Sequence, residues 1–208
     1  MTMMNKEMTI GQYLDKIIPE PWCELHFRTD YELLIAIVLS AQTTDKRVNQ
    51  VTEVLFSTYP DLESLGNADV SSIESILKSL GSFRKKAIYV QSIARLLCEK
   101  YEGKVPTDRE ILESFPGVGR KTVSVFLSEF YDIPAFAVDT HVERVSKRLG
   151  LASSSDNVLL VEEKLKRKFR REEWARRHKQ FVLFGRYYCK SVKPSCEGCE
   201  LRGICKEK

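Results

Sequence analysis

The sequence predicts an all-α protein. Apolar side chains recur at three- and four-residue spacing along most of the 208 residues, which is the period of a helix buried on one face. Clusters of Gly, Pro, Asn and Asp, which favour turns, separate these stretches. No run of four strand-like residues stands clear of a helical pattern. A fold built only from helices accounts for all three observations.

In the first half of the chain, apolar stripes define the helices. Residues 31–41 are apolar nearly all round, as expected of a central buried helix. Three further stretches carry one stripe each: Val48, Val51, Val54 and Leu55; Ile73, Ile76, Leu77 and Leu80; and Ile88, Ile93, Leu96 and Leu97. Turn signals at 59–61, 66–67, 81–82 and 103 divide them. Cys98 adjoins the last stripe, so we expect it to be a small core residue.

In the second half, start and stop signals define the helices. Residues 107–110 (Thr-Asp-Arg-Glu) form a capping box, which predicts a short helix that ends near Phe115 because Pro116 cannot continue it. The next helix starts just after Gly119 and runs to about Tyr131.

Two more start signals follow. Residues 140–143 (Thr-His-Val-Glu) form a second capping box, so a helix begins at Asp139 or Thr140 and stops at Gly150. Residues 153–156 hold the N-cap of a helix through Leu165. An aromatic stripe marks a last long helix, and we assign it to the core rather than to a base-stacking surface; its members are Phe181, Phe184 and Tyr188.

The composition is that of a soluble globular protein, with 43% hydrophobic and 30% charged residues. The longest apolar run, Leu33–Leu39, is far too short to span a bilayer. Residues 1–10 lack the apolar core and the cleavage site of a secretory signal. We therefore expect a cytoplasmic protein with reduced thiols and no membrane partner.

The charge is unevenly distributed. The net charge is +4, yet residues 164–193 hold twelve Lys or Arg against two acids, Glu172 and Glu173, so the rest of the chain is acidic. A basic C-terminal third indicates a polyanionic partner, most simply nucleic acid. The alternative interpretation is a solvated helix face.

A glycine-containing turn, Phe-Pro-Gly-Val-Gly-Arg-Lys at 115–121, lies between two expected helices. Gly117 and Gly119 can take positive φ, and without a Cβ they let a ligand approach the backbone closely. Their N–H groups, with those that open the next helix, form an anion site, and Arg120 and Lys121 add charge beside it. Such a hairpin holds a phosphate without reading bases.

Lys121 and Asp139 each stand at the start of a helix. The partial positive charge at a helix N-terminus disfavours an ammonium and favours the free amine of Lys121, which can form a Schiff base. The same charge stabilises the Asp139 carboxylate. A free amine near a fixed carboxylate suits cleavage of a glycosidic bond. The alternatives are a phosphate contact for Lys121 and an ordinary N-cap for Asp139.

Four of the six cysteines crowd into the last twenty residues, with the spacing Cys189-x6-Cys196-x2-Cys199-x5-Cys205. Clustered thiols in a reducing compartment indicate a metal site rather than disulfides. Four thiolates suit structural zinc and an iron–sulfur cubane equally well, although the paired CxxC spacing of zinc ribbons is absent.

The chain resembles the endonuclease III family of helix-hairpin-helix DNA glycosylases with an iron–sulfur cluster loop. The matching segments follow the family in order and span nearly the whole chain: residues 39–45 (Leu-Ser-Ala-Gln-Thr-Thr-Asp), 115–122, 137–141 (Ala-Val-Asp-Thr-His), 178–187 and the cysteine array. The resemblance implies a two-lobed helical fold, with the helix-hairpin-helix motif at about 108–131 and a C-terminal [4Fe-4S] loop held by the four cysteines. It also implies a six-helix domain over 23–134, a cluster domain made of 1–22 plus 135–208, and DNA in the cleft between them.

The activity implied by the resemblance is base-excision repair. A bifunctional DNA N-glycosylase and abasic-site lyase would remove oxidised or ring-damaged pyrimidines through a lysine Schiff base, then cut the strand 3′ to the lesion by β-elimination. Its partner would be double-stranded DNA with a damaged base or an abasic site. We expect a monomer, associated with the nucleoid of a prokaryote.

The resemblance also implies a role for individual residues. Lys121 matches the lysine that attacks C1′, Asp139 matches the assisting aspartate, and Gln42 matches a residue that fills the gap left by the extruded base. The alternative for Gln42 is an interhelical hydrogen bond. The other expected DNA contacts are Gly117, Val118, Gly119, Arg120, His141, Lys190 and Lys193.

One position departs from the family pattern. A bulky apolar wedge commonly follows the Gly of a segment like residues 80–87, and here that position is Ser82, with Phe83 next to it. A serine cannot separate bases by filling volume, so Phe83 or a shifted loop takes this role. The preferred lesion and opposite base therefore stay open.

Two other functions remain open from the sequence. The first is a mismatch or photoproduct glycosylase of the same fold, although an adenine-mismatch enzyme would carry an added C-terminal domain and this sequence ends three residues after Cys205. The second is a non-catalytic helix-hairpin-helix module with structural zinc, which would not need Lys121 and Asp139.

Overall fold

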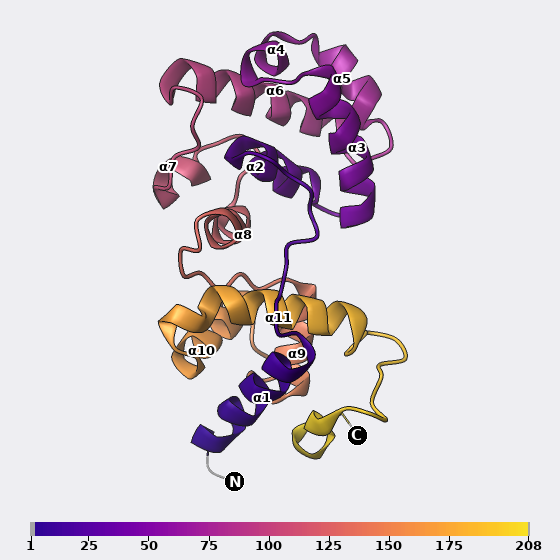
Figure 1. The fold of residues 1–208 in the computed structure, drawn as a ribbon, viewed down its shortest axis with the longest axis vertical. Coiled ribbons are helices and arrows are strands. Elements are labelled where there is room, and N and C mark those ends of the chain that lie inside the picture. Colours follow the sequence, from indigo (N-terminus) through magenta and orange to yellow (C-terminus); the bar gives the residue numbers. More distant parts are fainter. Residues whose placement is uncertain (1–2, 208) are drawn as a thin grey trace. The chain divides into compact units, whose positions relative to one another are not determined.

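The computed structural model describes residues 3–207, with side chains from residue 6 onward, and every regular element in that range is a helix (Figure 1). This confirms the all-α prediction. The chain divides into two compact units: unit 1 combines residues up to Trp22 with those from Tyr131 onward, and unit 2 covers Cys23–Phe130. Within the described range, no helix has both the length and the apolar character needed to cross a bilayer.

Unit 2 is organised around one central helix. Its helices are α2 (Asp30–Leu39), α3 (Asp45–Thr58), α4 (Leu62–Asn67), α5 (Val70–Leu77), α6 (Phe83–Lys100), α7 (Arg109–Glu113) and α8 (Arg120–Phe130). Every α2 residue from Glu32 to Leu39 is buried, and α2 packs against α3, α6 and α8 (Figure 1). The apolar run therefore forms a central buried helix, as its sequence predicted.

Helix α4 lies where the sequence suggested only a turn. Asp61 accepts a hydrogen bond from the Ser64 backbone N–H (2.7 Å), and the Ser64 side chain lies 3.4 Å from the Asp61 backbone N–H, which completes a capping box. This cap starts a short helix, and Gly66 and Asn67 fall in its last turn. The unit consequently has one helix more than the six expected.

Unit 1 joins the two ends of the chain. Its helices are α1 (Met3–Ile17), α9 (Thr140–Arg148), α10 (Val158–Lys168) and α11 (Trp174–Tyr187), with short 3₁₀ segments η1 (Arg171–Glu173) and η2 (Glu200–Ile204). Ile10 and Leu14 of α1 share a core with Phe136, Phe181 and Phe184. Helix α1 is missing from the sequence-based expectations.

The N-caps differ from those predicted at two helices, where the structure uses Asp108 in place of Thr107 and Asn157 in place of a residue in 153–156. At α9 the N-cap is Asp139, one of the two starting residues that the sequence predicted. In each case a short carboxylate or amide side chain accepts a hydrogen bond from the first turn, which stabilises a helix start. Asp156 is used elsewhere, because its carboxylate binds the Ser153 N–H and the Lys164 ammonium.

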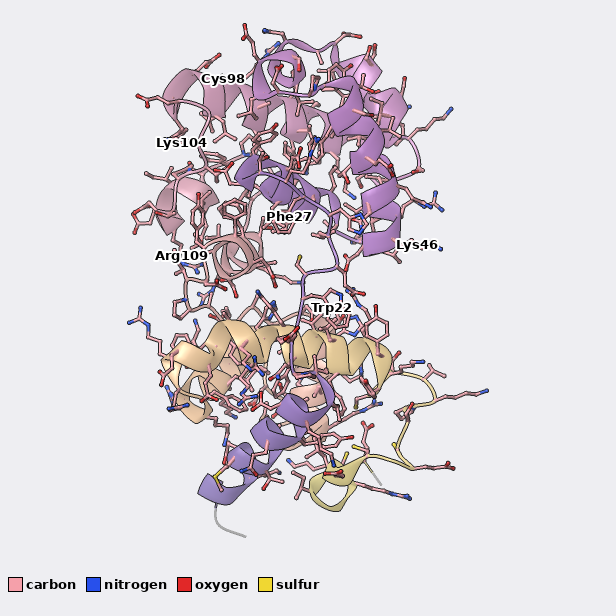
Figure 2. The ribbon with its side chains drawn as sticks, in the orientation of Figure 1. Trp22, Phe27, Lys46, Cys98, Lys104 and Arg109 are labelled. Carbon is pink, nitrogen blue, oxygen red and sulfur yellow. The ribbon has the colours of Figure 1, made fainter. Side chains whose placement is uncertain are left out.

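Gly150 and Cys98 are two single residues for which the sequence made a definite prediction. Gly150 takes φ of +65° after α9, which confirms the predicted helix stop. Cys98 is exposed, so its assignment to the core was wrong. It lies on the outer surface of unit 2, near the C-terminal end of α6 (Figure 2).

Candidate functional site

The predicted hairpin connects α7 to α8 in unit 2. Phe115 and Val118 are buried and anchor the turn, and the Val118 N–H donates to the Phe115 carbonyl at 3.1 Å. Gly117 has φ of +77°, and a Cβ placed there would lie 2.4 Å from Cδ2 of Tyr89 on α6. Only glycine fits this position. At Gly119 an added Cβ would meet open space, so the glycine requirement applies to Gly117 alone.

Lys121 lies directly behind this turn, as the second residue of α8, and its side chain is exposed together with that of Arg120. Arg109, at the start of α7 (Figure 2), braces the two helices. Its guanidinium donates to the Ser124 hydroxyl at 3.1 Å and to the Arg120 carbonyl at 3.5 Å. The lysine therefore projects into solvent from a rigid helix start.

Three exposed turns of unit 2 hold a non-glycine residue in the left-handed region. Gln42, between α2 and α3, has φ of +56°, Ser82, the N-cap of α6, has φ of +55°, and Glu102, after α6, has φ of +52°. Such residues store backbone strain and are enriched at functional sites, and Gln42 and Ser82 are the two in segments that match the family. In the part of the chain that the structure describes, the exposed Gln42 side chain makes no hydrogen bond, so it does not form the interhelical bond considered above.

The residue beside Ser82 is only partly available as a wedge. Phe83 begins α6 and is half-buried, and the Arg84 guanidinium lies 5.1 Å from the centre of its ring. Ser82 itself is exposed and presents no apolar volume.

Asp139 and His141 lie at the start of α9, in unit 1. The Asp139 Oδ1 accepts the backbone N–H groups of His141 (2.9 Å) and Val142 (2.8 Å), so this residue is an N-cap in the ordinary sense. The cap does not use the second carboxylate oxygen, Oδ2. The His141 ring is half-buried, and its Nδ1 lies 3.2 Å from the Arg144 guanidinium. Lys121 and Asp139 thus belong to different units.

Sequence reasoning missed a close approach between α9 and α11. A Cβ on Gly185 would lie 2.9 Å from Cβ of His141. Arg144 donates to the Gly185 carbonyl (2.7 Å) and to the Cys189 carbonyl (3.2 Å). The signal was a glycine inside a helical pattern, which indicates close packing when it is not a helix end.

The four clustered cysteines line one cavity of about 70 Å³. Apolar side chains of Leu149, Phe184 and Pro194 close it from other sides. Burial raises the pKa of the Cys189 thiol, and the neighbouring Arg148 guanidinium acts in the opposite direction. Among residues 3–207, no three His, Cys, Asp or Glu side chains converge on a site for a single metal ion.

Arg148, at the end of α9, holds both ends of the cysteine segment. Its guanidinium donates to the Lys190 carbonyl at 2.6 Å and lies 3.6 Å from Cys189 Sγ. At the other end, its backbone carbonyl accepts the Lys206 N–H at 2.8 Å, and its guanidinium pairs with Glu207. Nothing in the local sequence distinguished Arg148 from its basic neighbours.

The basic segment is largely neutralised within unit 1. At least seven of its twelve basic residues form ion pairs with acids of the same unit: Lys164, Lys166, Arg167, Lys168, Arg170, Arg176 and Arg177. For most of these the structure favours the alternative of a solvated face, here with paired charges, whereas Arg177 is buried. Lys190 and Lys193 are exposed in the loop between the first two cysteines, and Lys193 has φ of +50°.

Known proteins resemble this chain along nearly its whole length. A model of the HhH-GPD superfamily of base excision DNA repair proteins matches residues 35–171. Endonuclease III of Bacillus subtilis (strain 168) is 45% identical over 197 residues, which cover 93% of this chain and 90% of that protein.

Two solved structures are similar in fold. A non-covalent complex of endonuclease III with DNA has a TM-score of 0.93 at 43% identity and covers 100% of this chain and 96% of that one. A trapped covalent intermediate of endonuclease III with DNA has a TM-score of 0.90 at 44% identity, with coverages of 97% and 96%. The chain therefore belongs to the endonuclease III family, within the HhH-GPD superfamily of base excision DNA repair proteins.

Proposed function

We propose that this protein is a bifunctional DNA glycosylase and abasic-site lyase that acts on oxidised or ring-damaged pyrimidines in double-stranded DNA. The observation that carries the proposal is the exposed Lys121 in the first turn of α8, directly behind a hairpin turn that only glycine can form. A relative with 44% identity has been trapped as a covalent intermediate with DNA, which supports the use of a nucleophile.

In the proposed reaction, the free amine of Lys121 attacks C1′ of a nucleotide that has left the base stack. The bond between C1′ and the base breaks, and its electron pair leaves with the base. Loss of a proton from nitrogen and opening of the sugar ring give a Schiff base. Removal of a C2′ proton then expels the 3′ phosphate by β-elimination, which cuts the strand 3′ to the lesion.

Asp139 would assist as a carboxylate. Because only Oδ1 serves as the N-cap, Oδ2 can stabilise positive charge on the sugar and accept protons released by the lysine. The cap fixes the orientation of the carboxylate, so its two roles do not conflict.

We infer that residues of both units contact the DNA. The hairpin residues Gly117–Arg120 would bind a backbone phosphate through their N–H groups and the Arg120 charge. Gln42 would enter the gap left by the extruded base, His141 would line the same site, and Lys190 and Lys193 would bind phosphates from the cysteine loop.

The cysteine cavity fits a [4Fe-4S] cluster held by Cys189, Cys196, Cys199 and Cys205. Four thiols that line one cavity would supply all the ligands of such a cluster. The spacing of the cysteines, which lacks the paired CxxC of zinc ribbons, supports the cluster over structural zinc. When bound, the cluster would cross-link the loop and hold Lys190 and Lys193 rigidly.

Because the similar endonuclease III proteins come from bacteria, we also infer that the protein acts on chromosomal DNA in the cytoplasm, in association with the nucleoid. A mismatch glycosylase or a zinc-bearing binding module is less well supported by the same findings.

Borohydride trapping tests the proposal. Wild-type protein and duplex DNA with thymine glycol or an abasic site should give a covalent complex, and Lys121→Gln should give none. Arg120→Gln is the matched control, because it removes one hairpin charge but leaves the amine, and it should bind more weakly yet still be trapped. Equal trapping of Lys121→Gln and wild type would exclude Lys121 as the nucleophile.

A further inference from the structure

Unit 2 contains a buried lysine that the reaction does not use. Lys86 on α6 is 5% exposed, and burial lowers its pKa. Its ammonium donates to the carbonyls of Leu39 (3.0 Å) and Ala41 (2.9 Å) and to the Thr43 hydroxyl (3.3 Å). All three acceptors are uncharged. Lysine is rarely buried without a carboxylate, because desolvation of its charge is unfavourable, so this arrangement is unusual for a residue that only fills the core.

The three acceptors surround one turn. Leu39 ends α2, where the helix dipole attracts a cation, and Ala41 and Thr43 stand on either side of Gln42. Gln42 is the left-handed residue, and its Cβ is strained against the backbone in that region. Such strain persists only where the surroundings fix the backbone. The Lys86 ammonium provides that restraint on both sides of Gln42.

The same residue also touches the second strained turn. The Lys86 backbone N–H donates to the carbonyl of Ser82 at 3.1 Å, as the first-turn hydrogen bond of α6. One turn further along α6, Tyr89 packs against Gly117 of the hairpin. Lys86 and Tyr89 are three residues apart and share a face of the helix. One face of α6 therefore supports the Gln42 turn, the Ser82 turn and the hairpin.

We propose that Lys86 is a positioning residue that fixes the Gln42 turn in register with the Ser82 turn, so that Gln42 enters the gap when a nucleotide is extruded. This inference rests on the proposed function, because it assigns Gln42 to the gap. Lys86 itself touches no substrate. Its effect is confined to substrates in which a gap must be filled, namely duplex DNA.

The test compares duplex and single-stranded substrates. Lys86→Met keeps an unbranched apolar stem, one atom shorter than lysine, and removes the ammonium. We expect kcat for base release from a duplex lesion to fall about 10- to 100-fold, as for a misplacement of about 1 Å. Schiff-base formation and β-elimination on a single-stranded abasic site should stay within about twofold of wild type, because there is no gap to fill.

A general loss of stability is separated by a matched control. Val90→Ala truncates a fully buried apolar side chain one turn along the same helix and removes no polar contact to either turn. It should lower the unfolding midpoint and leave the ratio of activities on duplex and single-stranded DNA unchanged. If Lys86→Met and Val90→Ala affect the duplex reaction equally at matched stability, Lys86 has only a structural role.

A double-mutant cycle tests the route through Gln42. Gln42→Ala should reproduce the duplex defect, and Gln42→Ala with Lys86→Met should be no worse than Gln42→Ala alone. Independent, multiplying losses of duplex activity in the double variant would overturn the proposal.

If Lys86→Met does not fold, Thr43→Val takes its place, because it removes one acceptor of the Lys86 ammonium. It should give a smaller loss of activity, confined to the duplex substrate. Equal losses of activity on both substrates would again overturn the proposal. Failure of the proposed function is distinct, because wild-type protein would then give no Schiff base on either substrate.

Discussion

The two units hold their exposed site residues in different ways. Unit 2 holds its strained turns in place by apolar packing and by Lys86, a buried cation bonded to uncharged oxygens. Unit 1 relies on ion pairs and arginines, such as Arg177, which is buried and bonded to Asp15, Glu173 and the Gly11 carbonyl. Removing one partner of such a buried pair leaves an uncompensated charge. The stability and binding of unit 2 should therefore be sensitive to changes in side-chain shape, and those of unit 1 to changes in charge and pH.

The largest effect is expected at Asp139, where one substitution separates the chemical role of the carboxylate from its role as the N-cap of α9. Asp139→Asn keeps the N-cap, since asparagine caps as well as aspartate, but removes the carboxylate. We expect the unfolding midpoint to stay the same and base release to slow about 10²- to 10⁴-fold. Single-turnover assays with a duplex lesion would measure this. A rate within twofold of wild type would reduce Asp139 to a cap.

Charge reversal on the cysteine loop is expected to have the next largest effect. Lys190→Glu with Lys193→Glu should weaken DNA binding and reduce the slope of log K against log salt by about 2, one per lost phosphate contact. The control is Arg167→Glu with Arg170→Glu, an equal charge change at exposed residues that are already ion-paired. Binding titrations at several salt concentrations measure both. Equal slopes for the two variants would mean that the loop does not contact DNA.

A pair of glycine substitutions tests the claim that unit 2 depends on shape. Gly117→Ala must adopt φ of +77° and displace Tyr89, so we expect a loss of about 2 kcal/mol or more in the free energy of unfolding, with weaker DNA binding. At Gly119 the added methyl group meets open space, so Gly119→Ala should change the free energy of unfolding by no more than about 0.5 kcal/mol. Denaturant titrations compare them, and similar losses would contradict the assignment.

The smallest expected effect concerns acid stability in unit 1. The Arg177 and Arg176 guanidiniums and the Gln180 amide outweigh desolvation and lower the pKa of Asp15 from 3.8 to about 2. A depressed pKa stabilises the fold above pH 3.8, and this contribution is lost as the pH falls toward 2.

The corresponding variant is Asp15→Asn. It should be less stable near neutral pH by about 1 kcal/mol or less, since Asp15 is partly exposed, and its unfolding midpoint should fall less steeply between pH 4 and 2. If the unfolding midpoints of the variant and the wild type fall in parallel with pH, the ion pair between Asp15 and Arg177 does not contribute to acid stability.

Much of unit 2 was predictable because its signals are local. The apolar run of α2 and the Pro-Gly turn before α8 each determine their structure from a few neighbouring residues. The cap positions were less predictable, since Thr107 and Asp108 both can serve and geometry selects one. Cys98 was misassigned because it lies about 100° around the helix from the buried Leu97 and faces solvent.

The contacts around the site were not predictable, because they join distant positions. Lys86 meets Ala41 across 45 residues, and Arg144 meets Cys189 across the same separation. Periodicity cannot reveal such pairs. The basic segment illustrates the same limit: seven of its residues find acids in the folded unit, two of which, Glu7 and Asp15, are at the other end of the chain.

Unit 1 is built from two separate segments of the chain, and this affects the order in which the protein folds during synthesis. Asp15 is made 162 residues before its partner Arg177, and all of unit 2 emerges between them. At about 5–20 residues per second, α1 waits roughly 8–30 s for α11. During that time its apolar residues, Ile10 and Leu14, have no core to enter. Unit 2 is thus positioned to fold first on the ribosome, and α1 docks last.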